Sequence, residues 1–355
     1  MKRFKKALCI TGGAVGTILI LLVCAVLYLT IREYRPDPVE DIQVPSGSSR
    51  KPAPGDELTF MTYNIGYGGL SQNEDFFMDG GTKVEPESRE LVEENMQGIA
   101  DILAANPADA YFLQEVDINS KRSYHIDEQQ YLEKALGLGS MFAYNFKCDF
   151  VPYPLPFIGH VEGGLLTMTN MQVQEAVRIS LPESFSWPVK TCNLKRCLLK
   201  SRIPLEGTDK ELVLVNLHLE AYDSGEGKIA QSKMLAEILK EESDKGNYVI
   251  AAGDFNQTFE GTKEKYPILV SDYWTPGVIS PSDLPEGFSF ALDDTYPTCR
   301  LLNAPYTGSY ETSQVYVIDS FIVSSNVSVK AVEVQDVNFR YTDHQPVKLT
   351  VTLTP

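Results

Sequence analysis

The sequence predicts an α/β layered domain behind one membrane-spanning helix. Three observations carry this prediction: an uncharged apolar run lies near the N-terminus, a proline-rich segment follows it, and strand-like runs then alternate with amphipathic helices. With 43% hydrophobic residues, the 355-residue chain can bury a large core. No second linker and no internal repeat interrupts residues 57–355, so we expect a single domain there.

The N-terminal run is predicted to be a transmembrane helix. Residues 7–31 contain no charge and are long enough to cross a bilayer with some tilt. The run follows a basic tail at residues 1–6, exceeds a signal-peptide core in length and lacks a small-residue cleavage site. On its other side Arg32 and Arg35 are partly offset by Glu33. The positive-inside rule therefore predicts a single-pass protein of the cell membrane, with a cytoplasmic N-terminus and an extracytoplasmic domain.

A linker is predicted between this helix and the domain. Residues 32–56 are rich in proline, serine and glycine, and five prolines fall within 36–55. Proline favours extended backbone, and the segment shows no apolar periodicity. We therefore expect a semi-rigid spacer.

Two helices and six strand-like runs are predicted in the domain. The helices cover residues 86–105 and 226–244, where apolar residues recur at helical spacing; Asn106–Pro107 and Gly246 end them. The strand-like runs are short and apolar or alternating, and they span residues 58–64, 110–115, 212–218, 249–256, 316–323 and 347–353. Strands that alternate with helices are typical of layered α/β folds.

Polar side chains stand in or near the ends of the strand-like runs. They are Asn64, Glu115, His218, Asp254, Asn256, Asp319, Asp343 and His344. A single polar residue at a strand end could simply start a turn. Six segments that each carry such residues need another explanation. A buried carboxylate persists where it is paired, hydrogen-bonded or bound to a metal. Carboxylates suit Mg²⁺ and a histidine near neutral pH moves protons, so this inventory fits the hydrolysis of a phosphate ester.

The order of these motifs resembles a known family. The segments MTYN (61–64), QEVD (114–117), NLHL (216–219), GDFN (253–256), IDSFIV (318–323) and TDHQPV (342–347) resemble the endonuclease/exonuclease/phosphatase (DNase I-like) superfamily. The resemblance covers about residues 57–355 and extends to membrane-anchored bacterial members. It implies a two-sheet β-sandwich flanked by helices, in four α/β/β/α layers.

The resemblance also implies a metal site. Glu115 would be the main ligand of Mg²⁺, with Mn²⁺ as an alternative ion. Asn64 would lie beside the metal, and Asp343 would lie at or near it.

The remaining residues would act on the phosphate and the attacking water. His218 would contact the phosphate, while Asp254 and Asn256 would position the phosphate and the water. Asp319 would accept a hydrogen bond from His344. Either His344 or Asp254 takes the proton of the water, and orientation of the ring by Asp319 favours His344.

Three features have open interpretations. Arg122 is either a clamp for the substrate phosphate or a solvated charge. The apolar, proline-rich stretch 150–158 either packs as an irregular loop or contacts lipid near the anchor. The domain also holds four cysteines, which allow three disulfide pairings and whose redox state stays open: Cys148, Cys192, Cys197 and Cys299.

The net charge of the predicted domain disfavours one class of partner. The whole chain carries −17, and because residues 1–35 hold six basic residues and one acidic residue, the rest carries −22. Such a domain repels polyanions, so nucleic acid is the less favoured partner. We expect a membrane-tethered, metal-dependent phosphoesterase for a lipid or small phosphate ester. An extracytoplasmic nuclease is the alternative, and a non-catalytic binding protein on the same fold is the second; no protein partner is evident.

Overall fold

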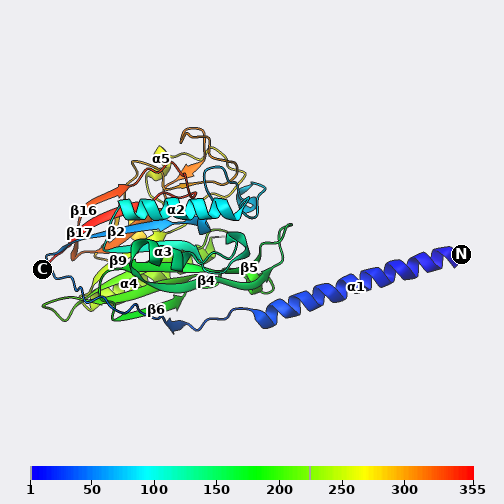
Figure 1. Cartoon of the computed structure of the whole chain (residues 1–355), viewed down its shortest axis with the longest axis horizontal. Helices are drawn as coiled ribbons and strands as arrows, with labels where there is room; N and C mark the ends of the chain where they lie inside the picture. The colour runs from blue at the N-terminus through cyan, green and yellow to red at the C-terminus, as the bar shows by residue number, and fades with distance from the viewer. Residues whose placement is uncertain (1, 224) are drawn as a thin grey trace.

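Two mixed β-sheets pack face to face in the computed structural model, which describes residues 2–223 and 225–355 (Figure 1). The larger sheet has the strand order β1-β6-β7-β8-β9-β15-β12, and the smaller has the order β16-β17-β2-β3-β5-β4. The core between the sheets is apolar: the rings of Phe112 and Phe321, one from each sheet, meet edge to face with their centroids 6.2 Å apart. The two-sheet sandwich predicted from the sequence is confirmed.

Five of the six predicted strand-like runs correspond to β2, β3, β8, β9 and β17. The larger sheet comprises β1 (Val39–Asp41), β6 (Glu175–Ser180), β7 (Cys197–Pro204), β8 (Glu211–His218), β9 (Tyr248–Asp254), β12 (Phe288–Ala291) and β15 (Asp319–Ser324). The smaller comprises β2 (Glu57–Asn64), β3 (Ala110–Asp117), β4 (Gly139–Val151), β5 (Gly159–Thr169), β16 (Val327–Val334) and β17 (Val347–Leu353). Two small sheets pair β10 (Gln257–Phe259) with β11 (Gly277–Ile279) and β13 (Cys299–Arg300) with β14 (Val315–Tyr316).

Helices cover the outer face of each sheet, which completes the four layers (Figure 1). α2 (Arg89–Ala105) and α3 (Glu128–Leu136) pack on the smaller sheet, and α4 (Glu226–Asp244) packs on the larger. The hydroxyl of Ser88 accepts a hydrogen bond from the backbone N–H of Leu91, so α2 begins slightly later than predicted. The described residues also form a short helix α5 (Thr262–Lys265) and five 3₁₀ turns: η1 (Gly66–Gly68), η2 (Phe77–Asp79), η3 (Lys121–Ser123), η4 (Val189–Cys192) and η5 (Pro281–Asp283).

The N-terminal helix α1 (Lys2–Arg32) extends away from the domain (Figure 1). Its stretch Ile10–Arg32 has a mean hydropathy of 2.7 and is almost entirely exposed. The helix is therefore long and apolar enough to cross a membrane, as the sequence predicts.

The segment predicted as a linker contains the short strand β1, which pairs with β6 at the edge of the larger sheet, and Arg50 forms an isolated β-bridge with Met171. The predicted strand over 316–323 is split, because Tyr316 belongs to β14 and the chain enters the larger sheet only at Asp319. In both cases the backbone pairs with a strand that is distant in sequence, which local propensity does not encode.

The domain cysteines are not paired. All four are buried and carry free thiols in the structure, which describes each of them: Cys148, Cys192, Cys197 and Cys299.

Candidate active site

Three strand pairings bring the polar strand ends to one edge of the sandwich. β8 and β9 run parallel, with His218 opposite Asp254, and β15 runs antiparallel to β9, with Asp319 opposite Asp254. In the other sheet β2 and β3 run parallel, so Asn64 ends beside Glu115. Because the sheets are stacked, these ends meet across the sandwich.

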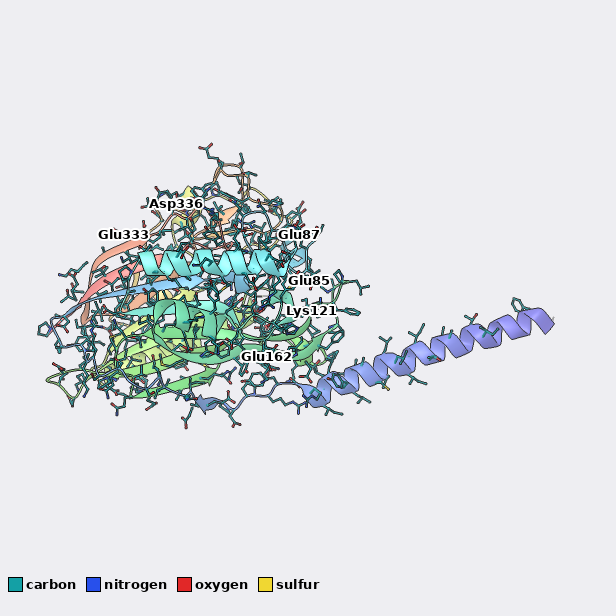
Figure 2. All side chains as sticks on the ribbon, in the orientation of Figure 1. Glu85, Glu87, Lys121, Glu162, Glu333 and Asp336 are labelled. Atoms are coloured by element: carbon teal, nitrogen blue, oxygen red, sulfur yellow. The ribbon has the colours of Figure 1, made fainter. Side chains whose placement is uncertain are left out.

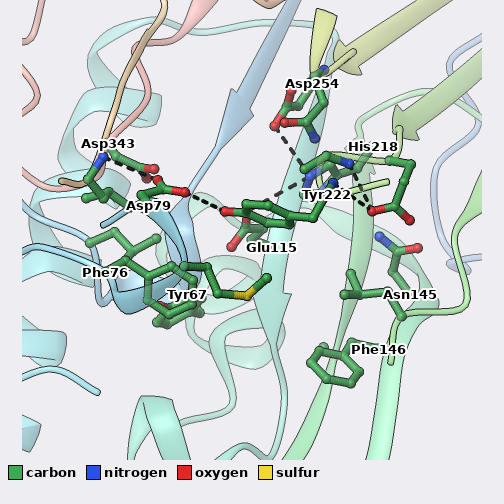
Figure 3. A pocket seen from close by; sticks show the side chains of 18 of the residues that line it. Tyr67, Phe76, Asp79, Glu115, Asn145, Phe146, His218, Tyr222, Asp254 and Asp343 are labelled. Carbon is green, nitrogen blue, oxygen red and sulfur yellow. Dashed lines mark hydrogen bonds and ion pairs between the residues drawn. The ribbon is translucent and has the colours of Figure 1, made fainter. Parts of the chain in front are cut away.

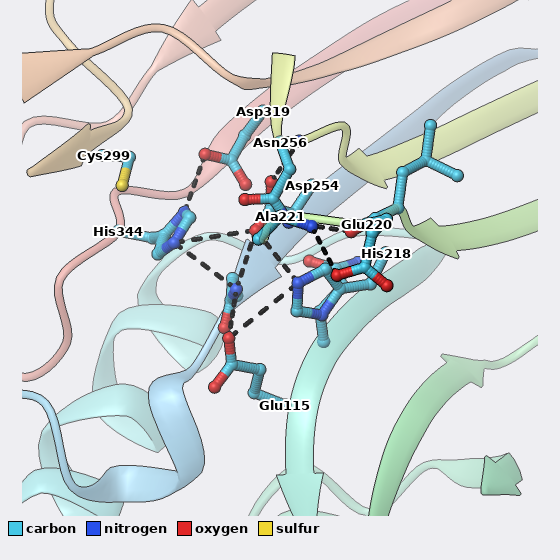
Figure 4. A network of polar contacts seen from close by, with 12 residues as sticks. Glu115, His218, Glu220, Ala221, Asp254, Asn256, Cys299, Asp319 and His344 are labelled. Atoms are coloured by element: carbon cyan, nitrogen blue, oxygen red, sulfur yellow. Dashed lines mark hydrogen bonds and ion pairs between the residues drawn. The ribbon is translucent and has the colours of Figure 1, made fainter. Parts of the chain in front are cut away.

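Asp254 lies at the centre of the resulting polar network (Figure 4). Its Oδ2 lies 3.1 Å from Asn64 Nδ2, 3.4 Å from His218 Nε2 and 3.7 Å from His344 Nε2. The same Nδ2 of Asn64 donates to Glu115 Oε1 at 3.1 Å, so one amide joins two carboxylates. Groups separated by up to 280 residues in the sequence thus share one hydrogen-bonded cluster.

His344 and Asp319 form a buried pair next to Asp254. His344 Nδ1 lies 2.8 Å from Asp319 Oδ2, and both side chains are almost fully buried. A proton on Nδ1 bonded to Asp319 leaves Nε2 directed at Asp254 and at Asp343 Oδ2, which lies 3.9 Å away. The carboxylate therefore fixes which ring nitrogen faces the centre of the site.

The backbone around these groups is specialised. Gly253 has a φ of +150°, and a Cβ atom there would lie 1.9 Å from the carbonyl oxygen of Leu217, so only glycine fits. Glu115 and Asn256 adopt left-handed φ angles of 54° and 50°, which are uncommon for such residues and often occur at functional sites. Phe255, between Asp254 and Asn256, is buried in the core just after the end of β9 at Asp254, and the turn at Asn256 keeps both polar residues at the site.

Burial and neighbouring charges shift the pKa values of three groups in the cluster. Burial and the adjacent negative charge of Asp319 raise the pKa of Asp254 to about 7. Burial by itself lowers the pKa of His344, but the surrounding carboxylates, Asp319 foremost, outweigh it and raise that pKa well above its ordinary value. Burial, helped by the guanidinium of Arg196, lowers the pKa of His218 well below its ordinary value. The two histidines thus differ, because their surroundings favour the cationic form of His344 and the neutral form of His218.

A cavity of about 150 Å³ opens beside this cluster (Figure 3). Seven of the nine residues predicted from the sequence line it: Glu115, Arg122, His218, Asp254, Asn256, Asp343 and His344. Asn64 and Asp319 do not line it and lie behind the wall, where they hold their partners. The rest of the lining is largely aromatic and apolar, which suits a partly organic ligand.

Arg122 is neither solvated nor free. Its Nε and one terminal nitrogen donate to the two oxygens of Asp117, both at 2.9 Å, and its guanidinium lies 3.8 Å from the ring centroid of Tyr67. The interpretation as a solvated charge is wrong, because this pairing and stacking bury the group. The pairing leaves the second terminal nitrogen available to the cavity, which Arg122 lines.

Sequence reasoning missed several residues of the lining. Tyr222 donates a 2.7 Å hydrogen bond to Asp79, the last residue of η2, and both residues line the cavity. Arg196 lines it too and lies 3.8 Å from Glu220. These residues belong to no motif and to no strand-end pattern, so the sequence did not indicate them. Asp117 could have been predicted as a site residue, because it is the last residue of the QEVD segment.

The carboxylates of the cavity fit a divalent cation. Glu115 and Asp343 both face the cavity and offer the hard oxygen ligands that Mg²⁺ prefers. Burial raises the pKa of Asp343 to about 6, and the charge of Glu115 adds to the rise, so a cation would relieve the repulsion among these groups. A compact set of possible ligand atoms from Asp254, Asp319 and His344 lies alongside. Asn64 directs its amide nitrogen, not its oxygen, at this cluster, so its role as a metal ligand stays a prediction.

Comparison with known proteins agrees with this geometry. The sequence profile of the Endonuclease/Exonuclease/phosphatase family matches residues 61–344. The chain belongs to this family. Members are hydrolases that act on phosphodiester bonds and generally use a divalent metal. No curated protein matches the chain closely enough to suggest a substrate.

Solved structures of the family share the fold. An endonuclease/exonuclease/phosphatase from Beutenbergia cavernae is 19% identical with a TM-score of 0.58, over 86% of this chain and 72% of that chain. The human Nocturnin catalytic domain with bound sulfate is 19% identical with a TM-score of 0.52, over 86% and 97% of the two chains. Truncated Caenorhabditis elegans TDP2 is 16% identical with a TM-score of 0.51, over 83% and 97%. At these identities the likeness shows the fold.

Proposed function

We propose that this chain is a membrane-tethered, Mg²⁺-dependent phosphoesterase that hydrolyses a lipid or small-molecule phosphate ester. The observation that carries the proposal is the convergence on one cavity of a carboxylate–histidine pair, a carboxylate with a raised pKa and two further carboxylates that suit a metal. These are His344 with Asp319, Asp254, and Glu115 with Asp343. The buried guanidiniums that line the same cavity favour an anionic substrate.

Glu115 and Asp343 would hold the metal. When bound, Mg²⁺ supplies Lewis acidity at a phosphate oxygen. His218, neutral and directed at Asp254 and Glu115, can donate to the phosphate without adding charge. Asn256 donates one hydrogen of Nδ2 to the carbonyl of Leu219 at 2.9 Å and retains the other for a phosphate oxygen.

The electrostatics favour Asp254 over His344 as the base. A general base works best when its pKa lies near the operating pH, and Asp254 meets this condition. The surrounding carboxylates, Asp319 foremost, raise the pKa of His344 and so favour its protonated form, whose Nε2–H can stabilise negative charge on the phosphate or the leaving oxygen. Asp319 keeps the ring in this orientation and stabilises its charge. Of the two alternatives that the sequence left open, we therefore prefer proton transfer from water to Asp254.

The tether is part of the proposal. α1 is long and apolar enough to span a bilayer, and the last turn of the helix is bonded to the domain through Arg32 and Asp149 at 2.6 Å. An extracytoplasmic orientation is supported by the basic tail before the span. A nuclease is the second candidate, on the strength of the family. The charge of −22 outside residues 1–35 disfavours it, since nucleic-acid affinity depends on neutralised phosphates.

A substrate panel tests the proposal. Full-length protein in detergent with Mg²⁺ is assayed on phospholipid in mixed micelles, bis(p-nitrophenyl) phosphate, p-nitrophenyl phosphate and supercoiled plasmid. We expect hydrolysis of the esters and little nicking of the plasmid. Faster turnover of the plasmid than of any ester would establish the nuclease instead. No hydrolysis across the panel would support the non-catalytic alternative.

A further inference from the structure

Large apolar side chains are exposed where the N-terminal helix joins the domain. We call five of them the apolar rim: Phe150, Leu155, Phe157, Trp187 and Val189, with exposed fractions of 40, 79, 41, 58 and 48%. The first three belong to β4 and to the turn between β4 and β5, and the last two lie at the start of η4. Soluble domains rarely gather such residues in one place without a partner.

The end of the apolar helix is fixed to the same two segments. Arg32 and Tyr28 bond to Asp149, which precedes the hairpin turn, at 2.6 and 3.2 Å. Trp187 Nε1 donates to Thr30 at 3.0 Å. In Figure 1 the helix leaves the domain at the end where β4 and β5 lie. A bilayer crossed by α1 would therefore begin beside the rim.

The hairpin that carries the rim also forms one wall of the cavity. Val151, Tyr153 and Ile158 line the cavity, while Phe150, Leu155 and Phe157 of the same hairpin point outward and are exposed. The segment near Trp187 contributes likewise, because Phe185 and Leu194 line the cavity. The cluster of Val151 and Ile158 includes Leu29 of α1, so the N-terminal helix packs against the cavity wall that this hairpin forms.

Charge near the rim does not favour an anionic surface. Lys121 is paired with Glu85 at 2.5 Å, and Lys147 is paired with Glu162 at 3.3 Å. Figure 2 shows Glu85, Lys121 and Glu162 close together at this end of the domain. Paired lysines offer little to an acidic lipid, so contact with a bilayer here would depend on apolar burial and tolerate zwitterionic lipid.

We propose that the apolar rim lies in the interface of the bilayer that α1 crosses, so that the cavity takes the phosphate headgroup of a membrane lipid without the lipid leaving the bilayer. This inference rests on the proposed function for the chemistry and on α1 as a membrane span. It adds the source of the substrate, the orientation of the cavity toward the membrane and the residues that make the contact.

Fluorescence quenching tests the membrane contact independently of activity. The chain has two tryptophans, Trp187 and the partly buried Trp274. In a Trp187→Phe background, Leu155→Trp adds a probe to the rim, and Val329→Trp adds one to β16, at the end of the domain away from α1 in Figure 1. Full-length proteins are placed in phosphatidylcholine nanodiscs with and without brominated acyl chains.

We expect the Leu155→Trp protein to be quenched at least twice as strongly as the Trp187→Phe background, and the Val329→Trp protein no more than that background. Equal quenching of the Leu155→Trp and Val329→Trp proteins would overturn the membrane contact. Trp274 is common to all three proteins and sets the same baseline in each.

Turnover tests the source of the substrate. In nanodiscs of phosphatidylcholine and phosphatidylethanolamine, Leu155→Glu should lower lipid hydrolysis at least fivefold and leave hydrolysis of bis(p-nitrophenyl) phosphate unchanged. The matched Val329→Glu should change neither rate. An unchanged lipid rate in Leu155→Glu, or wild-type turnover of the soluble ester without any lipid turnover, would overturn the inference. If the wild type hydrolyses neither the lipid nor the soluble ester, the proposed function is wrong. Fluorescence quenching then still tests the contact between the apolar rim and the membrane.

Discussion

His344 Nδ1 lies 2.8 Å from Asp319 Oδ2 in a site where both side chains are almost fully buried. The pairing raises the pKa of His344 and directs its Nε2 at Asp254. A carboxylate of this kind acts through the ring it orients, so its removal should alter the titration of His344 as well as the rate.

Asp319→Asn should lower the pKa of His344, because the charge that stabilises the imidazolium is gone. NMR titration of the four histidines, with His344→Ala to assign the resonance, measures this shift. The same two variants should lower kcat/KM by about 10²–10⁴, the range for positioned acid–base groups. A histidine titration unaltered by Asp319→Asn would show that the pair has no electrostatic role.

Asp254→Asn should abolish turnover and yet stabilise the metal-free protein at pH 8. The folded-state pKa of Asp254, about 7, lies above its unfolded value near 4, so ionisation destabilises the fold as pH rises between them. The gain in the free energy of unfolding should be at least about 1 kcal/mol at pH 8 and vanish near pH 4. Urea unfolding in EDTA at both pH values measures it, and a loss of stability at pH 8 would contradict the raised pKa.

Arg122→Lys should raise KM more than it lowers kcat. Lysine keeps the charge but cannot bond both oxygens of Asp117 and still present a nitrogen to the cavity. We expect kcat/KM to fall by about tenfold, the loss of one charge-assisted hydrogen bond. Arg340→Lys is the matched control, since Arg340 is exposed and lies over the ring of Tyr341. Equal KM values for the two variants would remove Arg122 from the substrate site.

Gly253→Ala should destabilise the protein by about 2 kcal/mol or more, because the new Cβ would overlap the carbonyl oxygen of Leu217 and its φ disfavours any side chain. Gly277→Ala is the control: the nearest atom to its Cβ lies at 3.6 Å, an ordinary contact. Chemical unfolding of both variants measures the difference. Similar stabilities would show that β9 can shift away from β8 without penalty.

The polar centre could be predicted because its residues follow buried strands at fixed spacing. Asp254 ends the buried strand β9, and Asp254 and Asn256 flank Phe255, whose ring lies in the core while both polar residues line the cavity. His344 and Asp319 were predictable only as members of an ordered set of motifs, since nothing local indicates that they touch.

The parts that could not be predicted depend on long-range pairing. The pairing of β1 with β6 joins chain segments more than 130 residues apart. No hydrophobic periodicity in the linker indicates this pairing. The bond between Asp79 and Tyr222 joins two segments that are likewise distant in the sequence. Arg122 was recognised as a candidate, but its burial depends on Tyr67 and Asp117, which lie on different elements.

Metal-dependent hydrolysis tests whether this cavity is a metal-assisted phosphoesterase site. Full-length protein is treated with EDTA, given Mg²⁺ or Mn²⁺, and assayed on bis(p-nitrophenyl) phosphate beside His344→Ala. We expect turnover to stop in EDTA, to return with either ion and to fall by about a hundredfold or more in His344→Ala. Undiminished release of nitrophenol in EDTA, or from His344→Ala, would contradict this expectation.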